Sequence, residues 1–158
     1  SVPTANDGAF KIDILASDSR GDLAFLVKFI GSSYNKNRFN YDNTEIGESL
    51  RFLSHELERR KVCSLNILPV HLPRFKSDGS CKVEKLNKND TSYFLDCLKE
   101  DVSRRVHSAN LFFEIDETVL EAKNRTELIE RLRNRGQQAI RITNFGEFIK
   151  NIEKSLSA

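Results

Sequence analysis

Two apolar stretches on either side of a charged segment decide the fold that the sequence predicts: Leu111-Phe112-Phe113-Glu114-Ile115-Asp116-Glu117-Thr118 and Ala139-Ile140-Arg141-Ile142-Thr143-Asn144-Phe145-Gly146. The charged segment ends at Gly136, a residue typical of helix C-termini, so the expected order is strand, helix, strand. Parallel α/β proteins place their chemistry at the carboxyl ends of their strands. The first stretch has acidic residues there, whereas the second has Thr143 and Asn144. The pattern indicates an active-site scaffold whose chemistry has been removed.

The remainder of the chain continues the alternation of strands and helices. The predicted strands are residues 10–16, 23–30, 63–70, 111–115 and 139–142, and the predicted helices are residues 44–60, 91–106, 118–135 and 145–156. The first two strands form a hairpin around the turn residues 17–22, and residues 74–89 form a polar loop. This order predicts an α/β fold with an open parallel sheet flanked by helices. Residues 1–9 are polar and expected to be flexible, ahead of one domain at residues 10–158.

The composition limits the partners that this chain can have. Its 25 basic and 23 acidic residues are interleaved, which gives a net charge of +2 and no concentrated basic surface for nucleic acid. No apolar run reaches the roughly 20 residues of a membrane span, so no membrane contact is expected. Cys63, Cys81 and Cys97 form no Cys-x-x-Cys pair, which favours reduced thiols, a cytoplasmic location and no metal site. Cys63 and Cys97 are expected in the core.

Five segments of the chain resemble the motifs of one known family. Residues 64–72 resemble a segment around Asn-Leu-Ser-Pro, and residues 113–118 resemble a Glu-Ile-Thr-Glu segment. Residues 132–136 resemble Leu-Arg-x-x-Gly, residues 143–146 resemble Asp-Asp-Phe-Gly, and a signature Glu-Ala-Leu-Leu-Arg-Trp falls on residues 24–29. In the order and spacing of these segments the chain resembles the EAL-domain family of bacterial cyclic di-GMP phosphodiesterases and their catalytically silent relatives.

The resemblance covers most of residues 10–148 and implies an incomplete modified TIM barrel. The chain would supply about the first five strands, with the N-terminal hairpin. A complete barrel takes about 250 residues and eight strands. Five strands cannot close it, and open sheet edges are normally covered or paired. A protein partner or a homo-oligomer is therefore expected to cover the open edge.

The resemblance also implies a degenerate site. Active members hold divalent metal ions with several oxygen ligands, and the metal ions activate a water molecule. In this chain Ala24, Thr143 and Asn144 stand where the family has carboxylates, whereas Asn66 and Glu114 remain. The chain is accordingly expected not to be an enzyme and to hold neither a metal ion nor a cofactor.

The remaining polar residues have structural interpretations as well. Asn66 could bond to neighbouring loops, and Glu114 could pair with Lys28 or Arg141. Glu117 suits the first turn of the helix that follows it, because an acid there complements the helix dipole. His107 is expected near a helix end, as a cap.

These observations leave three functions open. The first is a catalytically inactive regulatory module in bacterial signalling that acts through protein–protein interaction. The second is a receptor that binds cyclic di-GMP without hydrolysing it, with Lys28, Asn66, Arg74 and Glu114 as candidate contacts. The third is a small doubly wound α/β binding domain unrelated to the family.

Overall fold

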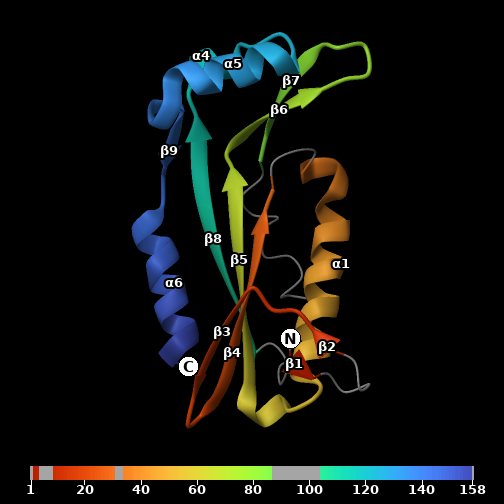
Figure 1. Ribbon diagram of the computed structural model, residues 1–158, viewed down its shortest axis with the longest axis vertical. Coiled ribbons are helices and arrows are strands. Elements are labelled where there is room, and N and C mark those ends of the chain that lie inside the picture. Colours follow the sequence, from red (N-terminus) through yellow and green to blue (C-terminus); the bar gives the residue numbers. More distant parts are fainter. Residues whose placement is uncertain (1, 4–8, 31–33, 87–103, 158) are drawn as a thin grey trace.

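The computed structural model describes residues 2–3, 9–30, 34–86 and 104–157 and shows a mixed α/β fold with a curled, half-barrel sheet (Figure 1). In spatial order, the sheet consists of β3 (Ile14–Asp18), β4 (Gly21–Phe29), β5 (Arg60–Pro69), β8 (Val106–Ile115) and β9 (Ile140–Ile142). The helical segments are α1 (Tyr34–Leu53), η1 (Leu57–Arg59), α4 (Glu117–Leu120), α5 (Arg125–Arg135), η3 (Gly136–Ala139) and α6 (Phe145–Ser157). Two antiparallel pairs lie outside this sheet, β1 (Val2–Pro3) with β2 (Ala9–Phe10) and β6 (His71–Phe75) with β7 (Cys81–Lys85). Among the described residues, no helix has both the length and the apolarity that a membrane crossing needs.

The centre of the sheet is parallel, as the sequence predicts. Strand β5 pairs in parallel with β4 on one side and with β8 on the other. Strands buried on both faces read as nearly continuous apolar runs, and β5 has such a run after its first two residues, interrupted by Ser64 and Asn66. The predicted N-terminal hairpin is confirmed, because β3 pairs with β4 in antiparallel register.

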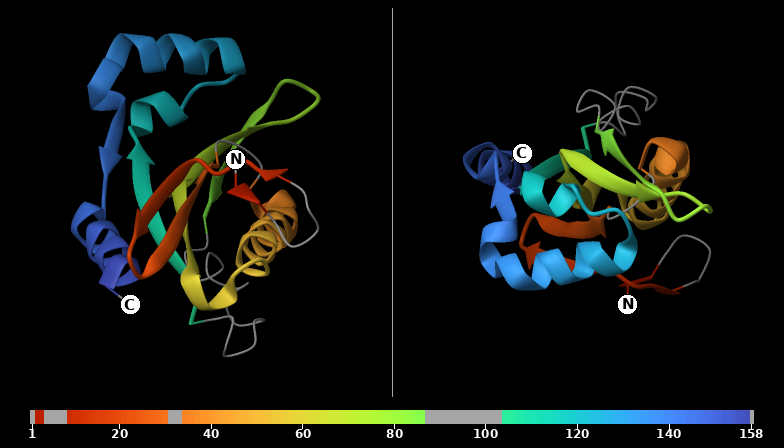
Figure 2. Two further views of the ribbon diagram at one scale, coloured as in Figure 1. Left: turned by 60° about the horizontal axis from the view of Figure 1, so that its bottom comes forward. Right: turned by 90° about the horizontal axis from the view of Figure 1, so that it is seen from above.

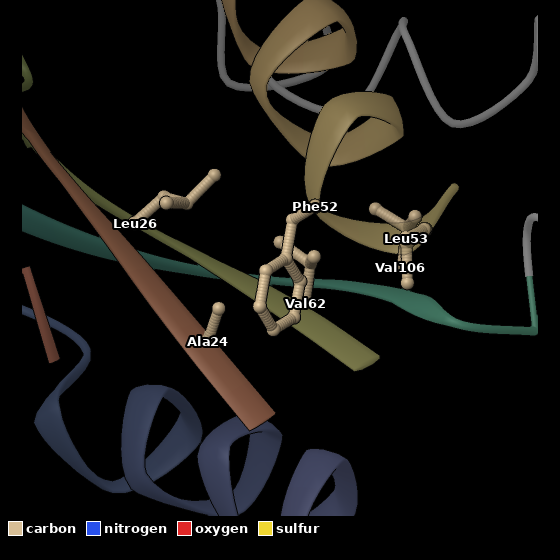
Figure 3. Packing of buried hydrophobic residues seen from close by; sticks show 6 residues of the cluster. All are labelled: Ala24, Leu26, Phe52, Leu53, Val62 and Val106. Atoms are coloured by element: carbon tan, nitrogen blue, oxygen red, sulfur yellow. The ribbon is translucent and has the colours of Figure 1, made fainter. Parts of the chain in front are cut away.

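One face of the sheet packs against α1. Ala24 and Leu26 of β4 lie beside Val62 of β5, and Figure 3 shows them facing Phe52 and Leu53 of α1 together with Val106 of β8. Ala24, Phe52 and Val62 are fully buried. The burial of each large apolar side chain contributes about 1.5–3 kcal/mol. This packing therefore attaches α1 firmly to the sheet.

A buried arginine, Arg60, lies beside this core at the start of β5. The guanidinium of Arg60 lies over the Phe52 ring, with Cζ 4.5 Å from the ring centroid, and its Nη1 donates to the Phe52 carbonyl at 2.9 Å. A buried cation needs such partners, because desolvation of an unpaired charge is costly.

The opposite face packs against α6. Because side chains alternate along a strand, Leu23 and Phe25 point away from α1, and they pack with Cys63, Phe148 and Ile152. Burial raises the pKa of the Cys63 thiol, which makes it an unreactive core residue. This confirms the interpretation of Cys63, whereas Cys97 lies outside the described residues.

The last strand runs in the direction opposite to the one predicted. Strand β9 is antiparallel to β8, with Ile142 opposite Phe113 and Ile140 opposite Ile115. The predicted helix at residues 118–135 is broken into α4 and α5, because Asn124 caps a new helix by accepting a hydrogen bond from the Glu127 amide. Helix α5 crosses the carboxyl ends of the strands instead of returning along the sheet (Figures 1 and 2). The chain thus enters β9 from the carboxyl edge.

Other boundaries differ from the prediction as well. Helix α1 begins at Tyr34, although residues 31–43 look like a polar loop, and Tyr41 packs beside Ile30 and Leu68. Tertiary contact here outweighs low helix propensity. Strands β6 and β7 replace most of the predicted loop at residues 74–89. Gly79 occupies their turn with φ 82°, and Asp78 accepts a hydrogen bond from the Ser80 amide.

Other predicted elements fare differently. Val2–Pro3 forms β1 and pairs with β2, which begins at Ala9, while the flexibility of residues 1–9 stays a prediction. The predicted helix at residues 91–106 lies outside the described residues up to residue 103. His107 is a residue of β8 and does not cap a helix, because that strand already begins at Val106.

Gly21 supports a first prediction. Its φ is 140°, and a Cβ at this position would lie 1.9 Å from the carbonyl oxygen of Arg59. We expect Gly21→Ala to lower the free energy of unfolding by about 2 kcal/mol or more, through strain and collision with backbone. Urea denaturation followed by circular dichroism measures the change.

Gly47 provides the matched control, because it lies in the middle of α1 and a Cβ there meets nothing within 4 Å. Gly47→Ala should stabilise the protein by about 0.5–1 kcal/mol through helix propensity. Equal effects of the two substitutions would contradict the close approach at Gly21.

His107 supports a second prediction. Burial, together with the charge of Lys61, lowers the pKa of this imidazole below its ordinary value of 6.5. The unfolded chain therefore binds more protons than the folded chain below about pH 6.5, and stability falls as the pH falls through that range. We expect His107→Gln to flatten the dependence of the melting temperature on pH between about 7 and 5. The same slope in His107→Gln and in the wild type would count against this role.

Candidate functional site

A pocket of about 310 Å³ lies at the carboxyl end of β8. Its lining comes from the end of β8, the start of α4, η3 and β9: Glu114, Ile115, Asp116, Glu117, Gln138, Ala139 and Arg141. The structure thus brings the two predicted acidic residues, Glu114 and Glu117, to one site. We call this site the carboxyl-edge pocket.

Two ion pairs organise the charges of the carboxyl-edge pocket. Glu114 and Arg141 face each other across β8 and β9 and form an ion pair, which is one of the two pairings that the sequence left open. The carboxylate of Glu114 raises the pKa of Arg141. Arg135 extends from the end of α5 and places its Nη2 2.8 Å from the Oδ2 of Asp116.

Asp116 has a structural role at the start of α4. As N-cap it accepts hydrogen bonds from both the amide and the hydroxyl of Thr118. The side-chain hydrogen bond from Thr118, followed by that from Arg135, lowers the pKa of the Asp116 carboxyl. Glu117 is exposed in the first turn of the same helix, as its structural interpretation predicted.

The carboxyl-edge pocket is lined mainly by charged and polar side chains. Two of its three acids are neutralised by arginines, and its lining contains no Ser, Cys or His that could act as nucleophile or base. Within the described ranges, no group of three His, Cys, Asp or Glu side chains could hold a metal ion. What remains is a set of charged side chains that can bond to polar groups of a ligand or of another protein.

The structure places Lys28 and Asn66 elsewhere, on the face of the sheet that α1 covers. The Nζ of Lys28 lies 2.8 Å from the Oε2 of Glu48 on α1, and both side chains are partly buried. Asn66 is buried, and its Nδ2 donates to the Oδ1 of Asn110 at 3.0 Å. The polar partner of Asn66 is therefore on the adjacent strand. Ala24 shares this face and belongs to the core under α1.

Arg74 lies in a third location. It is part of β6, and its Nη1 is 2.7 Å from the Oε1 of Glu84 on β7. The hairpin of β6 and β7 projects beyond the carboxyl end of the sheet in Figure 1. Of the four candidate contacts Lys28, Asn66, Arg74 and Glu114, only Glu114 is among the residues that line the carboxyl-edge pocket.

Thr143 and Asn144 do not lie beside Glu114 at the carboxyl end of β8. The reversal of β9 places Thr143 next to Phe112, where the Thr143 amide donates to the Phe112 carbonyl at 3.0 Å. The side chain of Asn144 continues this pairing: its Oδ1 accepts from the Phe112 amide and its Nδ2 donates to the Asn110 carbonyl, both at 2.8 Å. This position requires one hydrogen-bond acceptor and one donor, and an amide side chain supplies both. Asn144 is a structural residue here.

Asp116 and Gln138 of the carboxyl-edge pocket were not predicted as site residues from the sequence. Asp116 could have been recognised, because Asp followed by a helical segment is a typical N-cap. Gln138 carries no comparable signal, since its place depends on the turn of the chain between α5 and β9. Comparisons of the chain with protein-family models, with curated proteins and with solved structures found no match.

The amide of Asn144 supports a third prediction. Asn144→Asp keeps the acceptor but loses the donor and turns a carboxylate oxygen toward the Asn110 carbonyl. We expect a loss of about 1–3 kcal/mol in the free energy of unfolding, measured by urea denaturation at neutral pH.

The control for Asn144→Asp is Asn43→Asp, the same chemical change at an exposed position of α1. It should cost no more than about 0.5 kcal/mol. Unchanged stability of Asn144→Asp would show that the amide does not hold β9 to β8.

Proposed function

We propose that this chain is a catalytically inactive regulatory module that acts by binding another protein through an apolar surface of its sheet. This surface consists of five exposed side chains, and we call it the open face: Ile14, Val27, Phe29, Ile140 and Ile142. Their exposed fractions range from 38% to 67%. Contiguous apolar surface of this kind is typical of sites that bind proteins.

The alternation of side chains places all five residues on the same side of the sheet. Leu23 and Phe25 pack toward α6, so Val27 and Phe29 point to that side as well. Phe29 stacks on Phe113 of β8, with ring centroids 6.1 Å apart.

The edge strands extend this surface in both directions. Ile142 is opposite Phe113 and Ile140 is opposite Ile115 in the register of β9 with β8. At the other edge, Ile14 of β3 is opposite Phe25. Residues opposite one another in antiparallel strands point to the same side. The open face therefore spans the sheet from β3 to β9.

Helix α6 leaves the open face exposed because it packs on the other half of the strands. Its Phe148 and Ile152 contact the cluster of Leu23 and Cys63, near the amino ends of β4 and β5. In Figure 1, α6 runs beside the lower part of the sheet and α5 crosses the upper end. Phe29, at the carboxyl end of β4, keeps 67% of its surface exposed.

The edges of the sheet favour the same function. Strands β3 and β9 are the two outer strands, and all three residues of β9 are exposed. Outer strands present backbone groups that can pair with another chain. Binding at the open face would cover both these groups and the apolar side chains. The EAL-like resemblance supports a function of this kind, because silent relatives of that family often act as regulators through protein contacts.

The nucleotide-receptor alternative receives less support from the geometry. Lys28 and Asn66 lie under α1, Arg74 pairs on the hairpin, and Glu114 pairs with Arg141. A nucleotide would need these groups to converge on one pocket.

The fourth prediction tests the open face. A tagged wild-type chain should capture a specific protein from an extract of its source cells, and Phe29→Asp with Ile142→Asp should abolish that capture. Burial of Phe29 at an interface is worth about 1.5–3 kcal/mol, so its loss should weaken binding roughly 10- to 100-fold. Mass spectrometry identifies the partner, and surface plasmon resonance with the purified partner measures the affinity.

Val83→Asp is the matched control, because Val83 is 41% exposed but belongs to the β7 hairpin. It should retain capture. Calorimetric titration with cyclic di-GMP belongs in the same set: saturable nucleotide binding, together with capture that survives the double substitution, would overturn the proposed function in favour of a receptor.

A further inference from the structure

A second pocket, of about 160 Å³, lies at the opposite end of the sheet, where the parallel strands begin. The turn between β3 and β4, the starts of β5 and β8, and the end of α6 form its walls. Its charged lining residues are Asp18, Arg20, Asp22, Arg59, Lys61 and Arg105. We call this site the amino-edge pocket.

The amino-edge pocket has an excess of positive charge. It is lined by four cationic side chains and two carboxylates. Asp18 is engaged by Arg20, whose Nε and Nη2 donate to the same carboxylate oxygen at 3.0 and 2.8 Å. The nearest partner of Arg105 is Glu58 at 3.4 Å, and that glutamate side chain is 91% exposed, so this pair is weak. Arg59 takes part in none of the ion pairs among the described residues.

Backbone packing and hydrogen bonds order part of the amino-edge pocket. Gly21 lies so close to the Arg59 carbonyl that the turn of β3 and β4 and the start of β5 are packed together. The Arg20 amide donates to the Oδ1 of Asp18, which orders the turn further. The Nζ of Lys61 lies 3.4 Å from the Ser155 carbonyl near the end of α6. Arg20 and Lys61 are thus held in advance, and cations held in this way lose less conformational entropy when they bind a ligand.

The size of the pocket selects a small ligand. A volume of 160 Å³ corresponds to roughly five water molecules at about 30 Å³ each, well under the roughly 300–1,000 Å³ of sites for drug-sized molecules. Two or more guanidinium groups around such a space suit a tetrahedral oxyanion, because their planar donors match its oxygens. The apolar residues of its lining include Ala16, Leu23 and Leu156.

We infer that the amino-edge pocket binds a phosphate-type oxyanion, either as a free ion or as the phosphoryl group of a small molecule. Arg59 and Arg105 supply the principal hydrogen bonds, and Lys61 adds charge. Asp18 orients Arg20 and keeps it at the rim. This site is separate from the open face, and its function does not depend on the function proposed above.

Isothermal titration calorimetry of the whole chain tests this site. The probes are inorganic phosphate and phenyl phosphate, titrated at about pH 8, where the phosphomonoester has lost its second proton, and at constant ionic strength with chloride. We expect one saturable site per chain. Arg59→Gln and Arg105→Gln should each weaken binding about tenfold or more, because each removes a charge-assisted hydrogen bond.

Arg125→Gln is the matched control, because Arg125 is exposed at the start of α5 and lies outside the pocket. It should bind like the wild type, and circular dichroism should show that all variants are folded. Tighter binding of phenyl phosphate than of phosphate identifies a phosphoryl group on a larger molecule as the ligand, and the reverse order identifies the free ion. Absence of saturable binding by either probe, or equal affinities of Arg59→Gln, Arg105→Gln and wild type, would overturn the inference.

Discussion

The parallel pairing of β5 with both of its neighbours is the constraint on which the rest of the structure depends. Since β4 and β8 bond to its two edges, and α1 and α6 pack on its two faces, β5 can carry few polar side chains. Those it carries need internal partners: Asn66 bonds to Asn110, and Arg60 bonds to the Phe52 carbonyl. Asn66 and Arg60 thus stabilise the fold and are withdrawn from ligands, whereas Lys61 of the same strand lines the amino-edge pocket.

The path of the chain after β8 follows from where its next helices lie. A strand parallel to β8 would require the chain to return to the amino edge through a crossover. Helices α4 and α5 instead remain at the carboxyl edge, so β9 descends beside β8 and α6 continues along the sheet (Figure 1). This arrangement places two ion pairs at the carboxyl edge, Arg135 with Asp116 and Arg141 with Glu114. The apolar face of α6 then packs on the lower half of the strands and does not cover their upper half.

The two ends of the sheet consequently differ in charge. Glu114, Asp116 and Glu117 gather at the carboxyl edge, where arginines from α5 and β9 neutralise two of them. Arg59, Lys61 and Arg105 gather at the amino edge, where one long contact to an exposed glutamate compensates Arg105. An apolar face lies between these ends. One small sheet therefore offers three chemically different surfaces, and each can be altered without touching the core under α1.

The sequence by itself determined the elements whose signals are local. Alternating residues and the turn at Gly21 predict the hairpin, the apolar run predicts β5, and residues 145–156 predict the closing helix α6. Glu114 and Glu117 were correctly expected together at the carboxyl end of β8. Tertiary structure alone decided the direction of β9, the long course of α1 and the sequestration of Lys28 and Asn66. These features depend on contacts between residues distant in the chain, such as those of the Asn144 amide with β8. A periodic pattern shows which side chains are apolar, but it does not show which strand or helix they will contact.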